Sequence, residues 1–456
     1  MAVMKPEPIS AYFEATGKLA KPAKPSRVFF GWWTVLATSL VTIWGTGYYA
    51  VGFAALFKPI SEDLGLGRAA TSVGRSLGQF GGGFEAPAVG WLTDKIGAKT
   101  LLLFGVGLMG LGLVLMLLVN SLWAFYVVWG VVVATGMNIS SQVPVEKTIS
   151  NWFIKQRGRA LSLRFIATGL ATVMVVPLIS WLIIVVGWRW TCAIGGVVLW
   201  MGGLPLYWFF IRRERPEYYG LLPDGAKAEA SVDQSKMVAR GVEYAARFQE
   251  FEFTARQAFR TYAFWLLIIG YIGFQMCVAV VFTHCIPMLT DMGFDPIRAS
   301  AVMSIAVGVN IPIRYVIGYF SDRLKKEHLR FLMGAALLIM AGAIVFFLFN
   351  QTMVTVYVFF IIFYLGQGTG MILYSLMRSR YFGRKGLASI QGISQMILMP
   401  FSMIAPIYAG WVYDSTGSYM GAFKIFVGLL VVGSVLVFFA RPPKPPAEIG
   451  DVRKFF

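Results

Sequence analysis

Long runs of apolar residues, separated by short polar stretches, dominate the chain from position 29 onward. The runs exceed the about 20 residues that a helix needs to cross a bilayer, whereas barrel strands would alternate over about ten. Because only helices and closed barrels satisfy the backbone in lipid, the pattern predicts an all-α membrane protein. The expected twelve spans are residues 29–56, 69–92, 100–119, 122–152, 160–186, 189–211, 259–287, 298–320, 329–350, 353–380, 387–412 and 420–440.

The composition excludes an ordinary soluble domain. Hydrophobic residues make up 57% of the chain and charged residues 14%, with a mean hydropathy of +0.68, whereas soluble chains are about half apolar and a quarter charged. A net charge of +18 would indicate nucleic acid as a partner in a soluble protein. Here the excess lies in the loops, so we expect contact with membrane lipid and none with nucleic acid.

Basic residues fall mainly in alternate loops. With the amino terminus inside, the short cytoplasmic loops hold Lys95, Lys99, Lys155, Arg157, Arg159, Arg323, Lys325, Lys326, Arg330, Arg378, Arg380, Arg384 and Lys385. The outer loops hold only Lys58, Arg68, Arg189 and Arg298. The positive-inside rule therefore predicts a multi-pass protein of a bacterial cytoplasmic (inner) membrane with both termini in the cytoplasm.

The spacing of the apolar runs predicts two halves. The runs stop after Phe210 and resume near Tyr262, with a charged stretch between them. We expect an amphipathic helix in "FTARQAFRTYAFW", capped by Thr254. The predicted parts are a cytoplasmic tail (1–28), a six-helix bundle (29–211), a cytoplasmic linker (212–258), a second six-helix bundle (259–440) and a cytoplasmic tail (441–456).

An internal repeat supports this division. "GWLTDKIGAK" begins at Gly90 and "GYFSDRLKKE" at Gly318, a separation of 228 positions, and "NWFIKQRGRAL" and "RYFGRKGLASI" recur at 229. Two echoes at one period predict pseudo-symmetric bundles with a substrate site near the midplane between them.

The first echo also carries a recognisable motif. Gly90 permits close helix approach, Asp94 can meet the amino terminus of a neighbouring helix, and Lys95 can lie at the lipid surface. The segment resembles the Gly-x-Leu-x-Asp-Arg/Lys-x-Gly signature of the major facilitator superfamily. The resemblance implies that this loop and its repeat latch the bundles in the outward-facing state and govern conformational switching. The residues assigned to switching are Gly90, Asp94, Lys95, Gly318, Asp322 and Arg323.

An arginine lies deep in the eighth predicted helix. In "VNIPIRYVIGYFSDR", Arg314 stands about 12 Å along the helix from Asp322. An arginine in a membrane helix is costly unless it faces a cavity or a partner, and its planar fork suits a carboxylate. Arg314 is therefore a candidate substrate-binding residue; the alternative is a structural ion pair with an intramembrane acid.

Within the superfamily, the chain resembles the monocarboxylate transporters and their bacterial relatives, the oxalate:formate antiporters. "GWWTVLATSLVTIWGTGYYAVGFAALFKPI" is similar to their first helix, "WFIKQRGRALSL" partly meets their second signature, and their helix-8 arginine falls on Arg314. The acidic partner of that arginine is replaced by Asn310, and the helix-1 lysine of animal members aligns with Val51. Helix 11 also lacks the lysine of the oxalate antiporters. The implied proton relay is therefore missing, and one strong cation favours one carboxylate.

Polar residues near the middle of the helices supply candidates for the rest of the lining. These are Tyr48, Tyr49, Asn138, Gln142, Gln275, Asn310, Tyr364, Gln367 and Gln395. Asn138 and Gln367 lie 229 positions apart, matching the repeat, and therefore rank first. Each of these residues could instead join two helices.

Four more charges lie within predicted helices. Glu146 and Arg164 are equidistant from the turn between helices 4 and 5, so an antiparallel hairpin would bring them level as a buried ion pair or, alternatively, a gate. Glu85, in "GGGFEAP", is a possible proton site, with a structural hydrogen bond as the alternative. Arg75 is ten residues from Glu85, too far along the helix to pair with it.

These features predict a secondary active or facilitative transporter of a small organic anion, a monocarboxylate above all, and not an enzyme. The sequence contains no phosphate-binding Gly-Lys-Ser/Thr loop, no catalytic triad and no His/Cys cluster, so we expect neither cofactor nor metal. The expected partners are a small organic acid and membrane lipid, and the protein is expected to be a monomer. Two alternatives remain: an exporter of larger amphipathic compounds, and a transporter-like sensor that does not transport.

Overall fold

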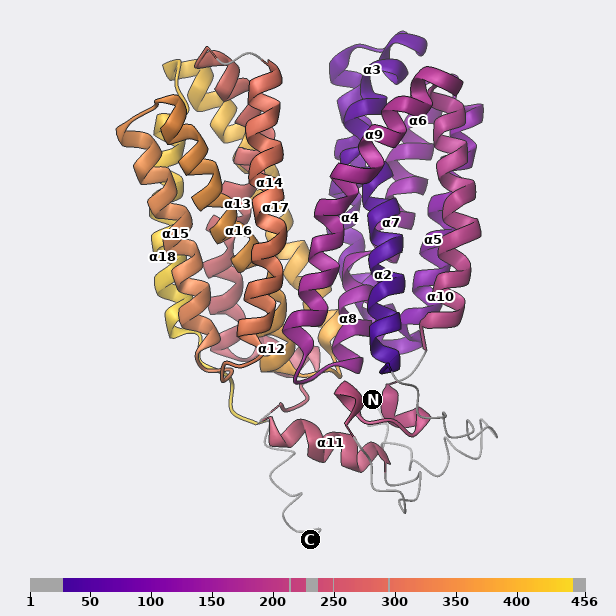
Figure 1. The fold of residues 1–456 in the computed structure, drawn as a ribbon, viewed down its shortest axis with the longest axis vertical. Coiled ribbons are helices and arrows are strands. Elements are labelled where there is room, and N and C mark those ends of the chain that lie inside the picture. The colour runs from indigo at the N-terminus through magenta and orange to yellow at the C-terminus, as the bar shows by residue number, and fades with distance from the viewer. Residues whose placement is uncertain (1–27, 213–214, 227–236, 249, 294–295, 446–456) are drawn as a thin grey trace, which may run out of the picture.

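The computed structural model describes residues 28–212, 215–226, 237–248, 250–293 and 296–445. Figure 1 shows two bundles of long helices standing side by side, with the short helix α11 (Met237–Arg247) across one end. We call that end the linker end and the opposite end the open end. The bundles lie close together at the linker end and stand apart at the open end (Figure 1).

The first bundle contains six passes, several of them interrupted. Their helices are α2 (Phe30–Thr46), α3 (Phe53–Asp63), α4 (Arg68–Ile96), α5 (Ala98–Leu115), α6 (Leu122–Phe125), α7 (Ala134–Ser140), α8 (Gln142–Trp152), α9 (Arg157–Val198) and α10 (Leu204–Phe210). A π-helical turn joins α2 to α3 with a bend of 44°. Gly187 has a φ of 79°, so α9 is two passes joined by a sharp turn there.

The second bundle contains six passes in order. They are α13 (Tyr262–Asp291), α14 (Pro296–Ser321), α15 (Leu329–Phe349), α16 (Met353–Phe382), α17 (Leu387–Thr416) and α18 (Met420–Phe439). Thr261 caps α13 through the backbone N–H of Phe264, and Thr352 caps α16 through that of Thr355. The twelve passes match the predicted ranges to within about four residues at their ends, except the first, which continues to Asp63 and not to 56.

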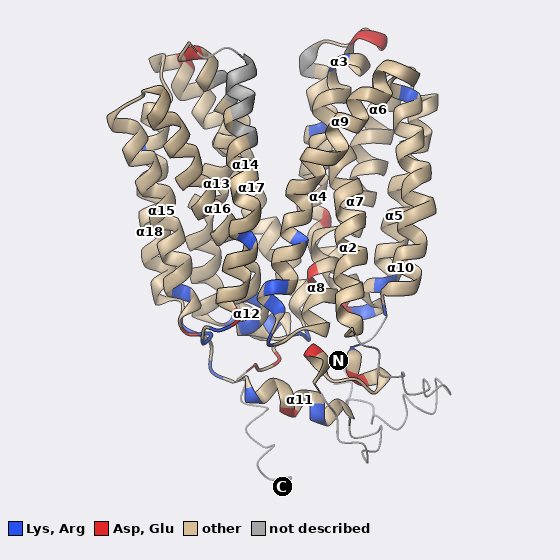
Figure 2. Ribbon diagram, in the orientation of Figure 1, with Lys and Arg blue, Asp and Glu red and all other residues tan. Residues whose placement is uncertain are grey.

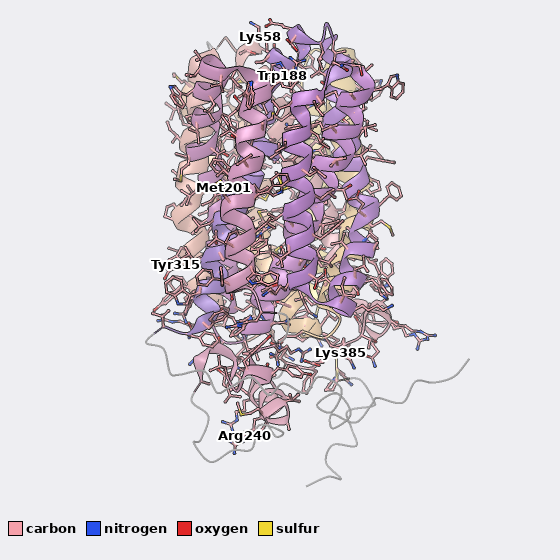
Figure 3. All side chains as sticks on the ribbon, turned by 90° about the vertical axis from the view of Figure 1, so that its right-hand side faces the viewer. Lys58, Trp188, Met201, Arg240, Tyr315 and Lys385 are labelled. Atoms are coloured by element: carbon pink, nitrogen blue, oxygen red, sulfur yellow. The ribbon has the colours of Figure 1, made fainter. Side chains whose placement is uncertain are left out.

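The outer faces of the bundles are apolar, as lipid requires. Met201 projects from the middle of the first bundle with 74% of its surface exposed (Figure 3), and Trp123 is 75% exposed. Eight helical segments of the described chain are long and apolar enough to cross a membrane, and the bent pair α2–α3 is a ninth. Lysine and arginine gather at the linker end (Figure 2), as the charge pattern predicts.

The segment before α13 is less helical than predicted. Thr254 does cap a helix, accepting a hydrogen bond from the backbone N–H of Gln257 at 3.3 Å. That helix, α12, spans only Ala255–Phe259, and a second cap at Thr261 begins α13 separately. Two threonine caps in close succession thus divide what the apolar periodicity suggests is one amphipathic helix.

Candidate functional site

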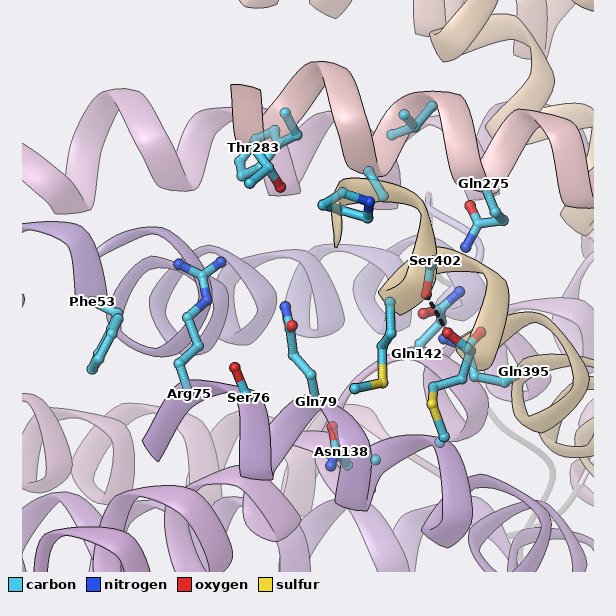
Figure 4. A pocket seen from close by; sticks show the side chains of 18 of the residues that line it. Phe53, Arg75, Ser76, Gln79, Asn138, Gln142, Gln275, Thr283, Gln395 and Ser402 are labelled. Carbon is cyan, nitrogen blue, oxygen red and sulfur yellow. Dashed lines mark hydrogen bonds between the residues drawn. The ribbon is translucent and has the colours of Figure 1, made fainter. Parts of the chain in front are cut away.

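A cavity of about 1050 Å³ lies between the two bundles. Its wall comes from α3, α4, α7 and α8 of the first bundle and from α13 and α17 of the second. Figure 4 shows side chains from both bundles pointing into it. The helix pass formed by α7 and α8 is broken at Ser141, whose φ of −113° and ψ of −106° are not helical. Discontinuous helices of this kind commonly border transporter substrate sites.

The charges on the cavity wall are positive. Arg75 and Lys58 line it, and no Asp or Glu does within the described part of the chain. Lys58 lies at the open end (Figure 3), where its exposed ammonium pairs with Glu62 at 3.6 Å. Arg75 points into the cavity (Figure 4), and its guanidinium carbon lies 5.9 Å from the ring centroid of Phe53. No described residue forms a hydrogen bond or ion pair with Arg75.

Four glutamines extend the polar wall from Arg75 toward the linker end. They are Gln79, Gln142, Gln275 and Gln395, which come from α4, α8, α13 and α17 (Figure 4). None of these four amides is hydrogen-bonded to another residue in the described ranges. Three of them, all predicted from the sequence, also line a smaller adjoining cavity of about 130 Å³. The amides therefore surround the midplane region in which a substrate site is expected.

An ion pair between the bundles borders the smaller cavity. Glu146 on α8 lies 3.6 Å from the guanidinium of Arg378 on α16 and accepts a hydrogen bond from Ser375. Glu146 and Arg164 form no direct ion pair among the described residues, although their charges still interact at longer range, so the predicted pair or gate stays a prediction. Arg164 is buried, with its guanidinium carbon 4.7 Å from the Phe165 ring centroid. The direct contacts of Glu146 are with Arg378 and Ser375 of the other bundle.

Arg314 belongs to a second polar cluster. Its Nε donates to Asn310 Oδ1 at 2.9 Å, and its Nη1 donates to the Phe165 carbonyl and, at 3.1 Å, to Thr168 Oγ1. Asn310 in turn donates to Gln367 Oε1 at 2.8 Å and to the carbonyl of Tyr364.

Three predicted substrate contacts, Arg314, Asn310 and Gln367, are thus brought together. Arg314 is only 8% exposed and lines neither cavity. In this conformation it joins α14 to α9 between the bundles, so its contact with substrate stays a prediction.

The remaining predicted site residues lie either at the cavity wall or in the core of the first bundle. Asn138 lines the cavity and donates to Glu85 Oε2 at 3.2 Å. Thr135 donates to Glu85 Oε1 at 2.5 Å. The Glu85 carboxylate therefore lies behind the wall residue Asn138, and its described hydrogen bonds come from side chains and not from the backbone. Tyr48 and Tyr49 are buried in the first bundle and line neither cavity.

The linker end is closed by two carboxylates that occupy equivalent places in the repeat. Asp94 accepts hydrogen bonds from the backbone N–H and hydroxyl of Ser389, in the first turn of α17, at 2.9 and 2.7 Å. Asp322 accepts from the backbone N–H groups of Gly158 and Arg159, in the first turn of α9, at 2.6 and 3.1 Å. Each acid therefore binds a positive helix end of the opposite bundle.

Further cations neutralise the two acids. Lys147 lies 2.8 Å from Asp94 and also donates to the carbonyls of Arg384 and Lys385. Arg380 lies 3.3 Å from Asp322. Burial raises the pKa of the Asp322 carboxyl, while Arg380 and the helix N–H groups act in the opposite direction.

The two motif glycines lie at close contacts between the bundles. A Cβ on Gly90 would come 2.3 Å from the carbonyl oxygen of Ala388, and one on Gly318 would come 2.5 Å from Ser162 Oγ. The predicted switching residues Lys95 and Arg323 form no hydrogen bond or ion pair with the opposite bundle among the described residues. Their charges lie over aromatic rings of their own helices, at 4.5 and 4.2 Å from the centroids.

The linker holds both loops of the second echo, a role that the sequence did not indicate. Asp224 accepts from three successive backbone N–H groups between α8 and α9, at 2.8–3.1 Å. Glu250 forms a two-point ion pair with Arg157, at 3.0 and 2.9 Å. Glu217 pairs with Arg384 at 2.8 Å. Both arginines are buried, and they occupy nearly equivalent places in the repeat, which is the signal that could have identified them.

Sequence reasoning also missed Arg75 as part of the wall. A signal was present, because Ser72, Arg75, Ser76 and Gln79 recur at helical spacing and all line the cavity. Polar residues three and four apart share one face of a helix. A polar stripe on a membrane helix indicates a face turned toward water.

Known proteins share this sequence pattern and fold. The family model described as Major Facilitator Superfamily matches residues 36–401. Monocarboxylate transporter 13 of Rattus norvegicus is 23% identical over 412 residues, covering 89% of this chain and 87% of that protein. A probable L-galactonate transporter of Escherichia coli (strain K12) is 26% identical over 420 residues, covering 87% of this chain and 85% of that protein. The solved structure of the proton:xylose symporter XylE aligns with a TM-score of 0.69 at 12% identity, covering 90% of this chain and 96% of that one.

Proposed function

The chain belongs to the major facilitator superfamily, and we propose that it carries a small organic anion, a monocarboxylate above all, across a bacterial inner membrane by alternating access. The family and the all-α fold agree with the sequence predictions. The chain is a multi-pass membrane protein of this family, and the relatives named above are transporters. The choice of substrate and the mechanism are our inference from the cavity.

One observation carries the proposal: the cavity between the bundles has a positive wall and no acidic side chain among its described lining residues. A carboxylate about 4 Å from a guanidinium gains about 4 kcal/mol at an effective dielectric constant of about 20. A cationic compound would meet repulsion of similar size. The wall therefore favours an organic anion over the cationic compounds that many exporters carry.

The charge pattern assigns the linker end to the cytoplasm. On that assignment the structure is an outward-facing state, with the substrate cavity open to the outside. Transport then requires the bundles to rock about the site, so that the Asp94 and Asp322 contacts break while the open end closes. Both residues would act on the rate of this exchange between states more than on substrate choice.

A substrate panel tests the proposal with purified protein. Thermal-shift screening of small organic acids identifies ligands, because a ligand that binds only the folded state raises its apparent stability. Uptake into proteoliposomes then separates the alternatives. Saturable flux of small acids supports the proposal, whereas flux of cationic dyes would favour an exporter and binding without flux would favour a sensor.

A further inference from the structure

Arg75 is an available cation in the substrate cavity. Of the other guanidiniums near the bundle interface, Arg378 pairs with Glu146, Arg314 donates to three protein oxygens, and the buried Arg164 lines neither cavity. At the open end Lys58 pairs with Glu62. Arg75 has no such partner among the described residues and points into the cavity (Figure 4). A half-buried guanidinium without an acid is available to an anion that enters the cavity, and its fork fits a carboxylate at two points.

The wall beyond Arg75 is suited to hydroxyl groups. Gln79 lies four residues further along α4, about 6 Å along the helix axis. Gln142, Gln275 and Gln395 follow toward the linker end. Each amide offers two donors and an acceptor, and none is used within the described protein. An apolar tail would leave these groups without partners, whereas a chain of hydroxyls can both donate to them and accept from them.

We propose that Arg75 binds the carboxylate of a polyhydroxylated monocarboxylate, an acid of the aldonate type, and that the four cavity glutamines bind its hydroxyls. This inference rests on the proposed function of anion transport, and adds to it a residue and a substrate class. Arg75 differs from the arginine that the family resemblance indicates, which is Arg314.

Three probes of similar size separate charge from hydroxylation: D-gluconate, hexanoate and sorbitol. Equilibrium binding and proteoliposome uptake of each are measured with the wild-type chain. Gluconate should bind and be transported. Hexanoate lacks the hydroxyls and sorbitol lacks the carboxylate, so each should bind at least about tenfold more weakly.

Two substitutions then test Arg75 itself. Arg75→Gln removes the charge and should raise the dissociation constant for gluconate by about tenfold to a hundredfold. Arg75→Lys keeps the charge but loses the fork, and should give an intermediate value. Arg189→Gln is the control, because it also removes one positive charge at the open end, at a residue that pairs with Asp63 and lies outside the cavity lining; its effect should stay below about threefold.

A fourth variant tests the amide wall. Gln79→Leu preserves the approximate size of the side chain and removes its hydrogen bonds. It should weaken gluconate binding by about three- to tenfold and leave hexanoate binding unchanged. Thermal unfolding of each variant in detergent shows whether the protein is folded, so that lost binding is not mistaken for lost structure.

Several results would overturn the inference. Wild-type affinity for gluconate in folded Arg75→Gln would do so, as would equal losses in Arg75→Gln and Arg189→Gln. Loss of gluconate binding in Arg314→Gln but not in Arg75→Gln would assign the carboxylate to the other arginine. If hexanoate is transported as well as gluconate, organic-anion transport stands and the hydroxylated substrate class is wrong. If no organic acid is bound or transported, the proposed function itself fails.

Discussion

Asp94→Asn should shift the protein away from the closed linker end. The carboxylate accepts two hydrogen bonds from Ser389 at the first turn of α17 and pairs with Lys147 at 2.8 Å. The asparagine side chain retains one acceptor oxygen but lacks the negative charge that strengthens the contacts with Ser389 and Lys147. Lys147, 7% exposed, would then remain buried beside neutral groups whenever the bundles close there.

The size of the shift follows from these contacts. A hydrogen bond to a charged group contributes about 1.5–3 kcal/mol, and a carboxylate at a helix amino terminus about 0.3–1 kcal/mol. Their loss should cost the closed linker end about 2–4 kcal/mol, which corresponds to a change of about 30-fold to 1000-fold in the ratio of the two states. The substrate cavity does not include Asp94, so equilibrium binding should change much less than flux.

Spin labels placed in pairs across the two ends can measure this population directly. The distance distribution at the linker end should lengthen in Asp94→Asn, and that at the open end should shorten. Asp63→Asn is the control, because Asp63 pairs with Arg189 at the open end and lies outside the bundle contact. Unchanged distances in Asp94→Asn, or losses of binding and flux by the same factor, would refute a switching role.

Three further predictions concern the linker, the interface and energy coupling. Glu250→Gln leaves the buried Arg157 without its acid and should lower the stability of the protein by about 3 kcal/mol, measured by thermal unfolding. Glu243→Gln, at an exposed ion pair, is the control and should change stability little. Equal effects of the two substitutions would argue against a role of the linker in holding the loops. Gly90→Val should prevent close approach at the linker end and abolish flux, which proteoliposome uptake checks; wild-type flux would contradict the contact. Glu85→Gln should abolish any uptake driven by an imposed pH gradient. Strong proton-driven accumulation in the Glu85→Gln variant would contradict both a proton site at Glu85 and transport that is insensitive to pH.

Features that repeat along the chain could be predicted from the sequence. The spans follow from apolar length, and the duplication follows from two echoes at one period. The Gly90 and Asp94 motif even indicated its contact with a helix amino terminus, because a carboxylate after a close-packed glycine has few other partners. The same reasoning located Gln142, Gln275 and Gln395 near mid-helix, and these side chains line both cavities.

Features that depend on the direction in which a side chain faces were harder to predict. Depth along a helix is readable from the sequence, but two residues at one depth meet only if both helices turn them toward each other. Glu146 makes its direct ion pair with Arg378 of the other bundle and interacts with Arg164 only at longer range. Arg314 is deep, as predicted, yet it lines neither cavity.

The linker posed a different difficulty. Its acids act by packing against loops that are remote in sequence. Glu217 reaches Arg384, 167 positions away, and no local pattern indicates such a contact. From the sequence alone, the loops that contain Arg157 and Arg384 resemble ordinary basic loops facing the cytoplasm, although both side chains are almost fully buried.

Counterflow of labelled gluconate tests the central claim most directly, because it needs no assumption about energy coupling. Proteoliposomes containing the purified chain are loaded with unlabelled gluconate and diluted into a trace of the labelled acid. The account predicts a transient accumulation of label that saturates with concentration, is absent from protein-free vesicles and is lost in Arg75→Gln. The absence of counterflow with gluconate and with every other small organic acid, from protein shown to be folded, would contradict organic-anion transport.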